Sequence, residues 1–419
     1  MKLLWLCNQV PGPVREHFSG KSGSALWVDS VFSDIRKRDI TLRVLCRGGE
    51  ASGELDERCS YALFPEILPE KYAPWMDDRF YKELIEFQPD LIHIWGTEYG
   101  HTLSMVNAAE KAGMLDRIVI SIQGLCSMIT RHFCEGIPDR VLHGYTFRDF
   151  VKRNNLLGQQ RVFALRGEHE QQALAKVNHV IGRTPWDMAA TGLINPGRTY
   201  HFCNETLRPE FYQGQWRYED CRRHRIFASG CNYPVKGFHY LLEAFAQILQ
   251  KYPDATLAVP GKNFCSPNFK ARLRESSYDR YLRNLVRKYH LEDKVEILGG
   301  LSAEQMRQEY LKANVFALPS TVENSPNSMG EAMLLGVPCV AADVGGVSAM
   351  LTHNTDGYIY QSTAPYMLAH YIDKVFSMGE AARSLGQSAA DHARTTHNAG
   401  KNLEALLEIY REIADVKEQ

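Results

Sequence analysis

Short apolar runs alternate along the chain with longer stretches in which apolar residues recur at helical spacing. Runs of this length are typical of buried parallel strands, and the longer stretches are typical of helices that cover a sheet. The predicted strands are residues 3–7, 41–46, 91–95, 117–122, 179–183 and 198–203, followed by 225–230, 256–260, 295–298, 315–318, 339–342 and 358–360. Strands that alternate with helices in this way predict an α/β protein with doubly wound parallel sheets.

A polar stretch over residues 204–225 interrupts this pattern. A chain of 419 residues exceeds the usual size of one domain, so this stretch is expected to connect two domains. We predict a first domain over residues 1–205 and a second over residues 206–399. The apolar run at residues 3–7 is too short for the core of a signal peptide, and we expect it to form the first strand.

The most specific pattern lies between the strands predicted at residues 315–318 and 339–342. Ser325 is a suitable N-cap, and Pro326 suits the first helical position, where its missing N–H costs nothing. Gly336 suits the left-handed exit from a helix. The sequence therefore predicts a helix over residues 326–335.

The start of this helix is an expected anion site. The backbone N–H groups of Asn327, Ser328 and Met329 lie in its first turn, at the positive end of the helix dipole. Glu323 and Glu331 bracket this turn, and carboxylates bind hydroxyl groups rather than phosphate. The favoured ligand is therefore a phosphate flanked by two polyols, as in a nucleoside diphosphate sugar. Alternatively, Glu323 is a solvated loop residue and Glu331 an ordinary helix glutamate.

The spacing of these two glutamates, with GVP and a later GG after them, resembles the Glu-x7-Glu motif of the retaining glycosyltransferases of family 4. The resemblance implies the GT-B fold, in which two Rossmann-like domains face each other across a cleft. It implies a catalytic Glu323 that contacts the donor sugar, and a donor-binding Glu331 that contacts the ribose. It also implies that a last helix, at about residues 400–419, returns to the first domain.

The start of the second domain carries the other donor-side residues that the resemblance implies. Lys236, a second catalytic candidate, matches the lysine that pairs with the donor diphosphate, while the donor-binding candidates Ser229 and Gly230 match the turn after the first strand. Gly300 matches the loop against which the nucleotide base lies. Cys231 replaces an arginine of the family, so one cation is expected to face the diphosphate where the family has two. A solvated Lys236 is the alternative.

Polar residues follow the predicted strands of the first domain, where open α/β sheets bind ligands. The loop that contains Gly23 resembles the glycine-rich loop after the first strand of family 4 enzymes. Gly23 is the best match in it, and we expect it to approach the donor. Glu98 and His101 are candidates for the acceptor side, with loop ordering as the alternative. Gln123 takes the place of a family histidine near the reacting sugar, and its amide can form hydrogen bonds but cannot titrate.

Composition narrows the class of partner. A net charge of −1 argues against nucleic acid as the main partner. Ten cysteines without a Cys-x-x-Cys pair indicate reduced thiols of a cytoplasmic protein. Without Asp-x-Asp or zinc-type spacing, we expect neither a metal nor a cofactor. Arginines and phenylalanines interleave over residues 131–166, which suggests either peripheral contact with an anionic membrane or a solvated helical face.

The resemblance implies transfer of a sugar from a nucleotide diphosphate sugar to a hydroxyl of a glycan, lipid-linked or small-molecule acceptor, in polysaccharide or glycoconjugate biosynthesis. The anomeric configuration would be retained and no metal required. The expected location is the cytoplasm, with the inner membrane surface as an alternative. Two other functions stay open. One is a nucleotide-sugar epimerase of GT-B architecture, and the other is a catalytically silent member that binds nucleotide or a partner, in which Cys231→Arg would raise activity.

Overall fold

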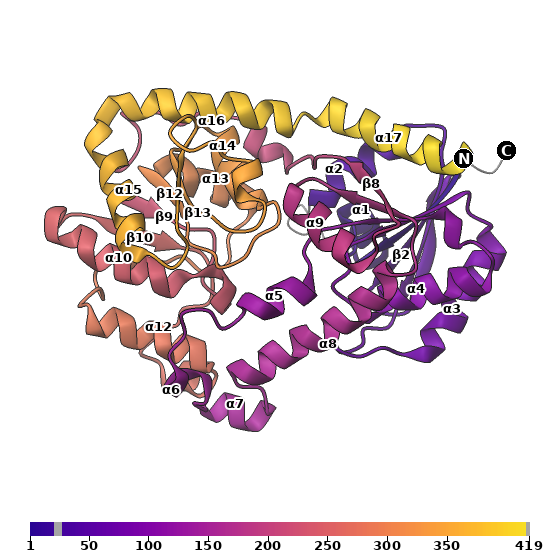
Figure 1. Ribbon diagram of the computed structural model, residues 1–419, viewed down its shortest axis with the longest axis horizontal. Helices are drawn as coiled ribbons and strands as arrows, with labels where there is room; N and C mark the ends of the chain where they lie inside the picture. The colour runs from indigo at the N-terminus through magenta and orange to yellow at the C-terminus, as the bar shows by residue number, and fades with distance from the viewer. Residues whose placement is uncertain (21–26, 416–419) are drawn as a thin grey trace. The chain divides into compact units, whose positions relative to one another are not determined.

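The computed structural model describes residues 1–20 and 27–415, and the chain divides into two compact units. Unit 1 comprises Met1–Thr130, Val162–Arg208 and His397–Gln419, and unit 2 comprises Arg131–Arg161 and Pro209–Thr396. Each unit contains one sheet with helices on both of its faces (Figure 1). None of the described helices is both long enough and apolar enough to cross a bilayer.

The sheet of unit 1 has the order β3-β4-β2-β1-β5-β6-β7-β8. Its strands are β1 (Lys2–Cys7), β2 (Thr41–Arg47), β3 (Ser52–Asp56), β4 (Cys59–Phe64), β5 (Leu91–Trp95), β6 (Ile118–Ser121), β7 (His179–Gly182) and β8 (Thr199–Phe202). All neighbours are parallel except β3 and β4, which form an antiparallel pair at one edge. The sequence prediction missed β3 because it alternates only between exposed and half-buried residues, and the polar segment SGELD has low strand propensity. It also overlooked β4, although the segment CSYALF is mostly buried.

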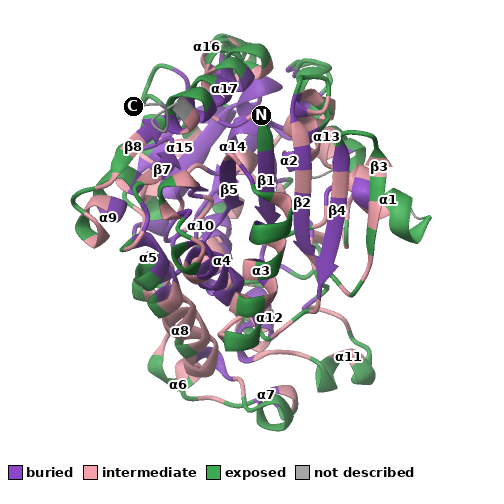
Figure 2. Ribbon diagram, turned by 90° about the vertical axis from the view of Figure 1, so that its right-hand side faces the viewer, coloured by how far each residue is buried: buried purple, intermediate pink, exposed green. Residues whose placement is uncertain are grey.

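The helices of unit 1 cover both faces of this sheet. They are α1 (Gly12–Ser19), α2 (Trp27–Ile35), α3 (Pro74–Phe87), α4 (Gly100–Lys111), α5 (Cys126–His132), α8 (Leu156–Leu174), α9 (Pro185–Ile194) and α17 (Ala399–Asp415), with the ends of α5 and α8 extending into segment 131–161. Side chains of β1 alternate between two cores, with Leu4 and Leu6 in one and Leu3 and Trp5 in the other. Figure 2 shows β1 and β5 as largely buried central strands.

The last helix, α17, belongs to the core on one face of the unit 1 sheet. Leu403, Leu406 and Tyr410 of α17 are buried there. The Tyr410 hydroxyl lies 2.6 Å from Nδ1 of the fully buried His93, whose Nε2 lies 2.7 Å from Oγ of Ser121. Burial lowers the pKa of His93 to about 3, so the ring is neutral and joins α17 to β5 and β6.

The sheet of unit 2 is entirely parallel, with the order β11-β10-β9-β12-β13-β14. Its strands are β9 (Arg225–Phe227), β10 (Thr256–Val259), β11 (Val295–Ile297), β12 (Val315–Leu318), β13 (Cys339–Ala342) and β14 (Tyr358–Tyr360). Its helices are α6 (Asp139–Leu142), α7 (Phe147–Lys152), α10 (Phe238–Lys251), α11 (Phe269–Leu273), α12 (Ser277–Lys288), α13 (Ala303–Lys312), α14 (Asn327–Leu334), α15 (Pro365–Met378) and α16 (Ala382–Thr396). Predicted strands at 91–95, 315–318, 339–342 and 358–360 have the observed bounds, and the strand predicted at 225–230 ends three residues early, at Phe227.

Segment 131–161 packs within unit 2, although the predicted division placed it in the first domain. Ile137 and Leu156 are buried in the core that α10 and α12 also line. Gly136 has φ +72°, and a Cβ there would lie 2.0 Å from the hydroxyl of Tyr240 on α10. The sequence order hides this arrangement because the segment lies between two elements of the first sheet.

Candidate functional site

Both sheets have a switch point, where successive connections run in opposite directions. In unit 2 it lies between β9 and β12, and in unit 1 between β1 and β5. Open α/β sheets bind ligands outside the carboxyl ends of the strands at this point. The loops after these four strands, together with the helices that follow them, carry most of the predicted site residues.

In unit 2 the loop after β9 is held against the loop after β12. Gly237 has φ +61°, and a Cβ there would lie 1.8 Å from the carbonyl oxygen of Pro319. The backbone N–H of Thr321 donates to the carbonyl of Val235 at 2.9 Å. Only glycine permits this approach, so the Lys-Gly pair of the sequence places Lys236 beside the loop that begins at Pro319.

Lys236 and Glu323 form an ion pair at this junction. Nζ of Lys236 lies 2.6 Å from Oε1 of Glu323, which also accepts a hydrogen bond of 2.7 Å from the hydroxyl of Ser320. The Lys236 side chain is 38% exposed and that of Glu323 only 11%. The lysine can therefore move toward a ligand, while the carboxylate is held in place by Ser320.

A second glycine holds the backbone of Glu323. Gly345, in the GG that follows β13, has φ +54°, and a Cβ there would lie 1.7 Å from the carbonyl oxygen of Glu323. The N–H of Gly346 donates to the same oxygen at 3.1 Å. Gly345 and Gly346, the GG of the sequence pattern, therefore hold Glu323 in place through its backbone carbonyl.

The start of α14 differs in detail from the prediction. Pro326 occupies the N-cap rather than the first helical position, and no side chain caps the helix. The hydroxyl of Ser325 instead points to the sulfur of Met350. The N–H of Met329 donates to the carbonyl of Pro326, so the prediction of a free N–H at this residue was wrong.

Asn327 and Ser328 lie half-buried at the start of α14. Oδ1 of Asn327 is buried and has no hydrogen-bond partner among the described residues. A buried polar atom without a partner is costly, so this one marks a place where a ligand donor group would be favourable. Glu331 lies one turn further along and is 3% exposed, and the Tyr310 hydroxyl lies 3.5 Å from its Oε2. Glu331 is thus much less accessible than the sequence suggested.

The remaining donor-side residues border the same end of the sheet. Ser229 and Gly230 are half-buried after β9, and Gly300 is exposed after β11. A Cβ at Gly230 or Gly300 would meet no other atom within 4 Å, so neither glycine is required by its protein neighbours. The space beside both glycines is therefore open to a ligand.

Cys231 faces the core rather than the loops around Lys236. It is 1% exposed, and its thiol lies 3.8 Å from the carbonyl oxygen of Pro260. Burial raises the pKa of the thiol to about 12. A side chain that points this way leaves no room for the arginine of the family pattern. The nearby Lys262 is paired with Asp279 at 2.8 Å.

At the switch point of unit 1, Asn8 contacts Glu98. Nδ2 of Asn8, after β1, donates to Oε2 of Glu98, after β5, at 2.6 Å. Gly96 lies between them in the structure, and a Cβ there would lie 2.3 Å from Oε2 of Glu98. The pair borders a pocket that Gln9, Tyr99 and Arg166 also line.

Burial raises the pKa of Glu98 to about 7. The nearby Arg166 opposes this shift through its charge and also donates to the backbone carbonyl of Glu98 at 2.6 Å. Arg166 lies over the ring of Tyr99, as does Arg47. Glu98 is therefore a carboxyl that gains or loses a proton near neutral pH beside a polar pocket.

His101 supports this pocket from below its surface. It is 2% exposed, and its Nε2 lies 2.8 Å from Oδ1 of Asn8. The ring stacks on Tyr99 and contacts Phe64, and desolvation lowers its pKa to about 3. A neutral, buried His101 orients Asn8, and it is too buried to meet an acceptor directly.

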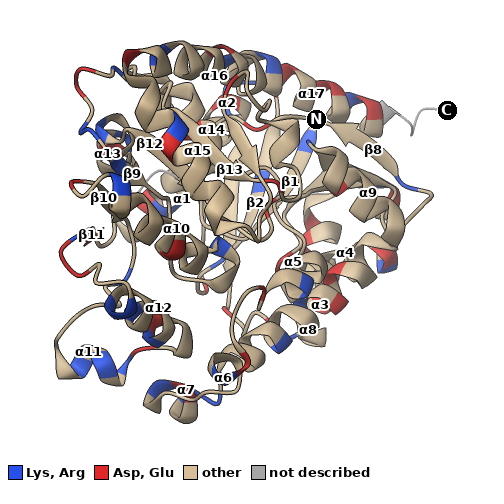
Figure 3. Cartoon of the chain, turned by 60° about the vertical axis from the view of Figure 1, so that its left-hand side comes forward, with Lys and Arg blue, Asp and Glu red and all other residues tan. Residues whose placement is uncertain are grey.

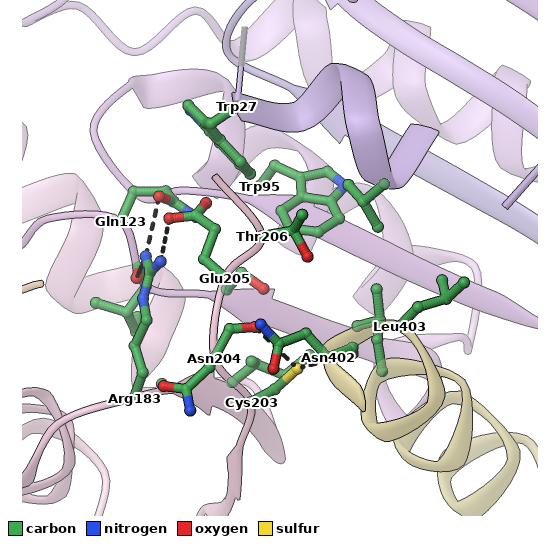
Figure 4. A pocket seen from close by; sticks show the side chains of 16 residues that line it. Trp27, Trp95, Gln123, Arg183, Cys203, Asn204, Glu205, Thr206, Asn402 and Leu403 are labelled. Atoms are coloured by element: carbon green, nitrogen blue, oxygen red, sulfur yellow. Dashed lines mark hydrogen bonds and ion pairs between the residues drawn. The ribbon is translucent and has the colours of Figure 1, made fainter. Parts of the chain in front are cut away.

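Gln123 lies next to a buried ion pair. Nη2 of Arg183, after β7, donates to Oε1 of Gln123 at 3.1 Å and to the carbonyl of Ile122 at 3.1 Å. Nη1 of Arg183 pairs with Glu205 (Figure 4). Oε1 of Glu205 and Nε1 of Trp95 are buried without a hydrogen-bond partner among the described residues. Arg183 and Glu205 line a pocket of their own. Gln123, Trp27 and Trp95 line both that pocket and the pocket beside Glu98.

Sequence reasoning missed Glu170, which organises the loops after β5 and β6. It is fully buried and accepts hydrogen bonds from the N–H groups of Cys126 and Ser127 and the hydroxyl of Thr97. Desolvation raises its pKa. Gly167, one turn earlier, permits α8 to approach Ser127, because a Cβ there would lie 2.8 Å from it. A glutamate inside a polar helical pattern carries no local signal of this role.

Gly23 lies outside the described residues, so its predicted approach to the donor stays a prediction. All ten cysteines are free, and most are buried, as expected for structural thiols. In the part of the chain that the structure describes, no three His, Cys, Asp or Glu side chains are arranged to hold a metal ion.

The sequence of unit 2 is similar to known glycosyltransferases. Residues 222–392 match the family described as glycosyl transferases group 1. The putative glycosyltransferase YtcC of Bacillus subtilis is 27% identical over 195 residues, which are 46% of this chain and 46% of that protein. The D-inositol 3-phosphate glycosyltransferase of Corynebacterium urealyticum is 25% identical over 185 residues, 44% of this chain and 42% of that protein. The chain thus matches less than half the length of these relatives.

Solved structures match nearly the whole chain. Sucrose-phosphate synthase from Thermosynechococcus elongatus has a TM-score of 0.74 at 16% identity, covering 99% of this chain and 100% of that one. HepE of Anabaena, in complex with UDP-glucose, has a TM-score of 0.65 at 19% identity, covering 100% of this chain and 99% of that one. At these identities the likeness concerns the fold. The predicted GT-B fold is therefore confirmed, and the similarities of unit 2 support a glycosyltransferase.

Proposed function

We propose that the protein is a retaining glycosyltransferase of the family 4 type, which moves a sugar from a nucleotide diphosphate sugar to an acceptor hydroxyl. The observation that carries this proposal is the contact between Lys236 and Glu323 at the switch point of unit 2. A cation and a carboxylate that meet where the sheet binds ligands suit a substrate with a diphosphate next to a polyol.

Each residue then has a distinct task. Lys236 turns from Glu323 to the diphosphate and neutralises charge on the leaving group. The released carboxylate of Glu323, still held by Ser320, accepts hydrogen bonds from hydroxyls of the donor sugar. The first turn of α14, at Asn327 and Ser328, adds the positive end of the helix dipole.

Retention of configuration follows from a front-face route. The departing diphosphate takes the acceptor proton, so no side-chain base is needed beside the sugar. The tasks assigned to Lys236 and α14 require no metal or cofactor. Glu331 contributes to the ribose side in this proposal, through the half-buried turn next to it.

A nucleotide sugar is favoured as the donor because HepE, which shares the fold, was solved with UDP-glucose. The nucleobase is open to test. A glycan, lipid-linked or small-molecule acceptor would enter the polar pocket beside Glu98 in unit 1, where the half-buried Trp27 can pack against a sugar face. Polysaccharide or glycoconjugate biosynthesis in the cytoplasm is the process we propose.

Calorimetric titration with UDP, GDP, ADP and dTDP sugars tests the donor site. One of these compounds is expected to bind the wild type, and Lys236→Ala is expected to weaken binding at least about tenfold, the scale of a lost charge-assisted contact. Lys251→Ala, an exposed lysine of unit 2 paired with Asp373, is the matched control. Equal affinity of the Lys236→Ala variant and the control would contradict the assignment.

Product analysis separates the enzymatic alternatives. A nucleotide-sugar epimerase would convert the donor without an acceptor, whereas a transferase leaves free nucleotide diphosphate and a glycosylated product. The silent, nucleotide-binding alternative draws support from Cys231, which supplies no cation. In that case the nucleotide sugar binds, and neither hydrolysis nor transfer follows.

A further inference from the structure

Two short helices of unit 2 expose an unusual set of apolar side chains. Around α7 the exposed fractions are 56% for Tyr145, 62% for Phe147, 74% for Phe150 and 64% for Val151. In α11 they are 72% for Phe269 and 38% for Leu273. Exposed single apolar residues are common, but a cluster of phenylalanines with most of their surface in water marks an interaction site.

The polarity of α7 is inverted relative to an ordinary surface helix. Its buried side chain is Asp149, which is 0% exposed and accepts a hydrogen bond of 2.9 Å from the N–H of Ser277 at the start of α12. Phe147, Phe150 and Val151 are spaced at i, i+3 and i+4 and so share one face of the helix. A polar contact anchors α7, and its apolar face is left to the solvent.

Cations accompany these apolar side chains. The exposed ones are Lys152, Arg153, Lys270, Arg272 and Arg274. Figure 3 shows α7 and α11 at the same end of unit 2, next to α12. The neighbouring carboxylates are already paired, since Glu275 contacts Arg283 at 2.9 Å and Asp279 contacts Lys262 at 2.8 Å. These five cations and six apolar residues form what we call the α7–α11 patch.

We propose that the α7–α11 patch docks on an anionic lipid bilayer. Phenylalanine rings favour the boundary between headgroups and acyl chains, and the flanking lysines and arginines favour anionic headgroups. A protein partner is less favoured, because charged residues are depleted in the core of protein interfaces, whereas five exposed cations of one sign accompany these apolar side chains. The patch lies apart from Lys236 and Glu323 in sequence and chemistry, so this docking does not depend on the proposed transferase activity.

Sedimentation of the whole protein with lipid vesicles tests the docking. Vesicles of phosphatidylcholine with about one third phosphatidylglycerol are compared with vesicles of phosphatidylcholine alone, at low and high salt. The wild type is expected to bind the anionic vesicles about tenfold more strongly, and binding is expected to fall as salt rises, because each exposed cation adds attraction to the anionic surface.

Variants separate the apolar from the charged contribution. Phe147→Ser with Phe150→Ser, and Lys152→Glu with Arg153→Glu, are each expected to reduce binding about tenfold. The matched controls lie in unit 1. Leu193→Ser removes a leucine that is 70% exposed, and Lys401→Glu with Arg411→Glu reverses two exposed cations of α17. Circular dichroism of every variant checks that the fold is intact.

Three results would overturn the proposal. The first is equal sedimentation with neutral and anionic vesicles, and the second is equal loss of binding in patch and control variants. The third is a stable oligomer in solution that dissociates in the Phe147→Ser, Phe150→Ser variant without any binding to vesicles. That result would assign the patch to a protein interface instead.

Discussion

Nζ of Lys236 lies 2.6 Å from Oε1 of Glu323, across the switch point between β9 and β12 of the unit 2 sheet. The corresponding point of unit 1 is bridged in the same way by Asn8 and Glu98, again at 2.6 Å. In each unit, loops that follow two neighbouring strands come together through a side chain from each. The two residues that the sequence nominated as catalytic in unit 2 therefore neutralise each other, and the proposed function requires a ligand to separate them.

Replacing Lys236 by Met or Glu323 by Gln is expected to lower turnover by about two to three orders of magnitude, because each change removes a charged contact to the transition state. Stability should change by less than about 1 kcal/mol, because the lysine is half-exposed and such pairs contribute little. Steady-state kinetics and thermal unfolding measure the two effects. Near-normal transfer by both variants would remove them from the catalytic site.

Substitution of Gly345 by Ala should impair donor binding through Glu323. The new Cβ would lie 1.7 Å from the Glu323 carbonyl oxygen, so this backbone must move. Gly379→Ala is the control, since Gly379 has a similar φ of +56° and its nearest new contact would be 3.5 Å away. Both variants should lose at least about 1 kcal/mol of stability, because alanine is strained at a positive φ, and only Gly345→Ala should weaken donor affinity in calorimetry. Equal affinities would show that the loop adapts.

Because burial raises the pKa of Glu98, we expect the stability of the protein to fall as the pH rises toward 7. The folded pKa of about 7 for this carboxyl exceeds its ordinary value of 4.5, so the folded protein holds this proton more tightly than the unfolded chain. The stabilisation by the proton is fully present below about pH 4.5 and is lost as pH rises through 7. Glu98→Gln should therefore flatten the fall of the unfolding temperature between these pH values. An unchanged profile would show that Glu98 titrates normally.

Cys231→Arg is expected to destabilise the protein, contrary to the gain of activity that the sequence suggested. The side chain is 1% exposed among apolar residues, and the neighbouring carboxylate of Asp279 is already paired with Lys262, so a cation buried at this position would lack a partner among the described residues. Urea unfolding should show a loss of several kcal/mol, compared with a small loss for Cys231→Ser. A stable and more active arginine variant would show that the side chain can turn toward the donor site instead.

The central strands could be predicted because they are fully buried and therefore continuously apolar. The central strands β5, β12 and β13 have the predicted bounds, as does the mostly buried edge strand β14, and the resemblance around Glu323 predicted the GT-B fold. The edge strand β3 could not be predicted in this way, because it has no apolar run to recognise, whereas β4 has a buried apolar run that the prediction overlooked.

The donor side of the site was more predictable than the acceptor side. Lys236 and Glu323 lie next to glycines whose loops must touch, so the local pattern carries three-dimensional information. Arg183, Glu205 and Glu170 act through contacts between distant segments, and a single sequence does not reveal which partner a buried charge will find. His101 shows the same limit, because its neighbour Asn8 lies 93 residues away along the chain.

Segment 131–161 has a consequence for how the protein can be divided. Because this segment caps α12 through Asp149 and Ser277, neither unit corresponds to a continuous stretch of the gene. A fragment that begins at Pro209 would lack this cap and the core residues Ile137 and Leu156. Independent expression of unit 2 therefore calls for a chain in which a linker replaces residues 162–208 and joins residues 131–161 to residues 209–396.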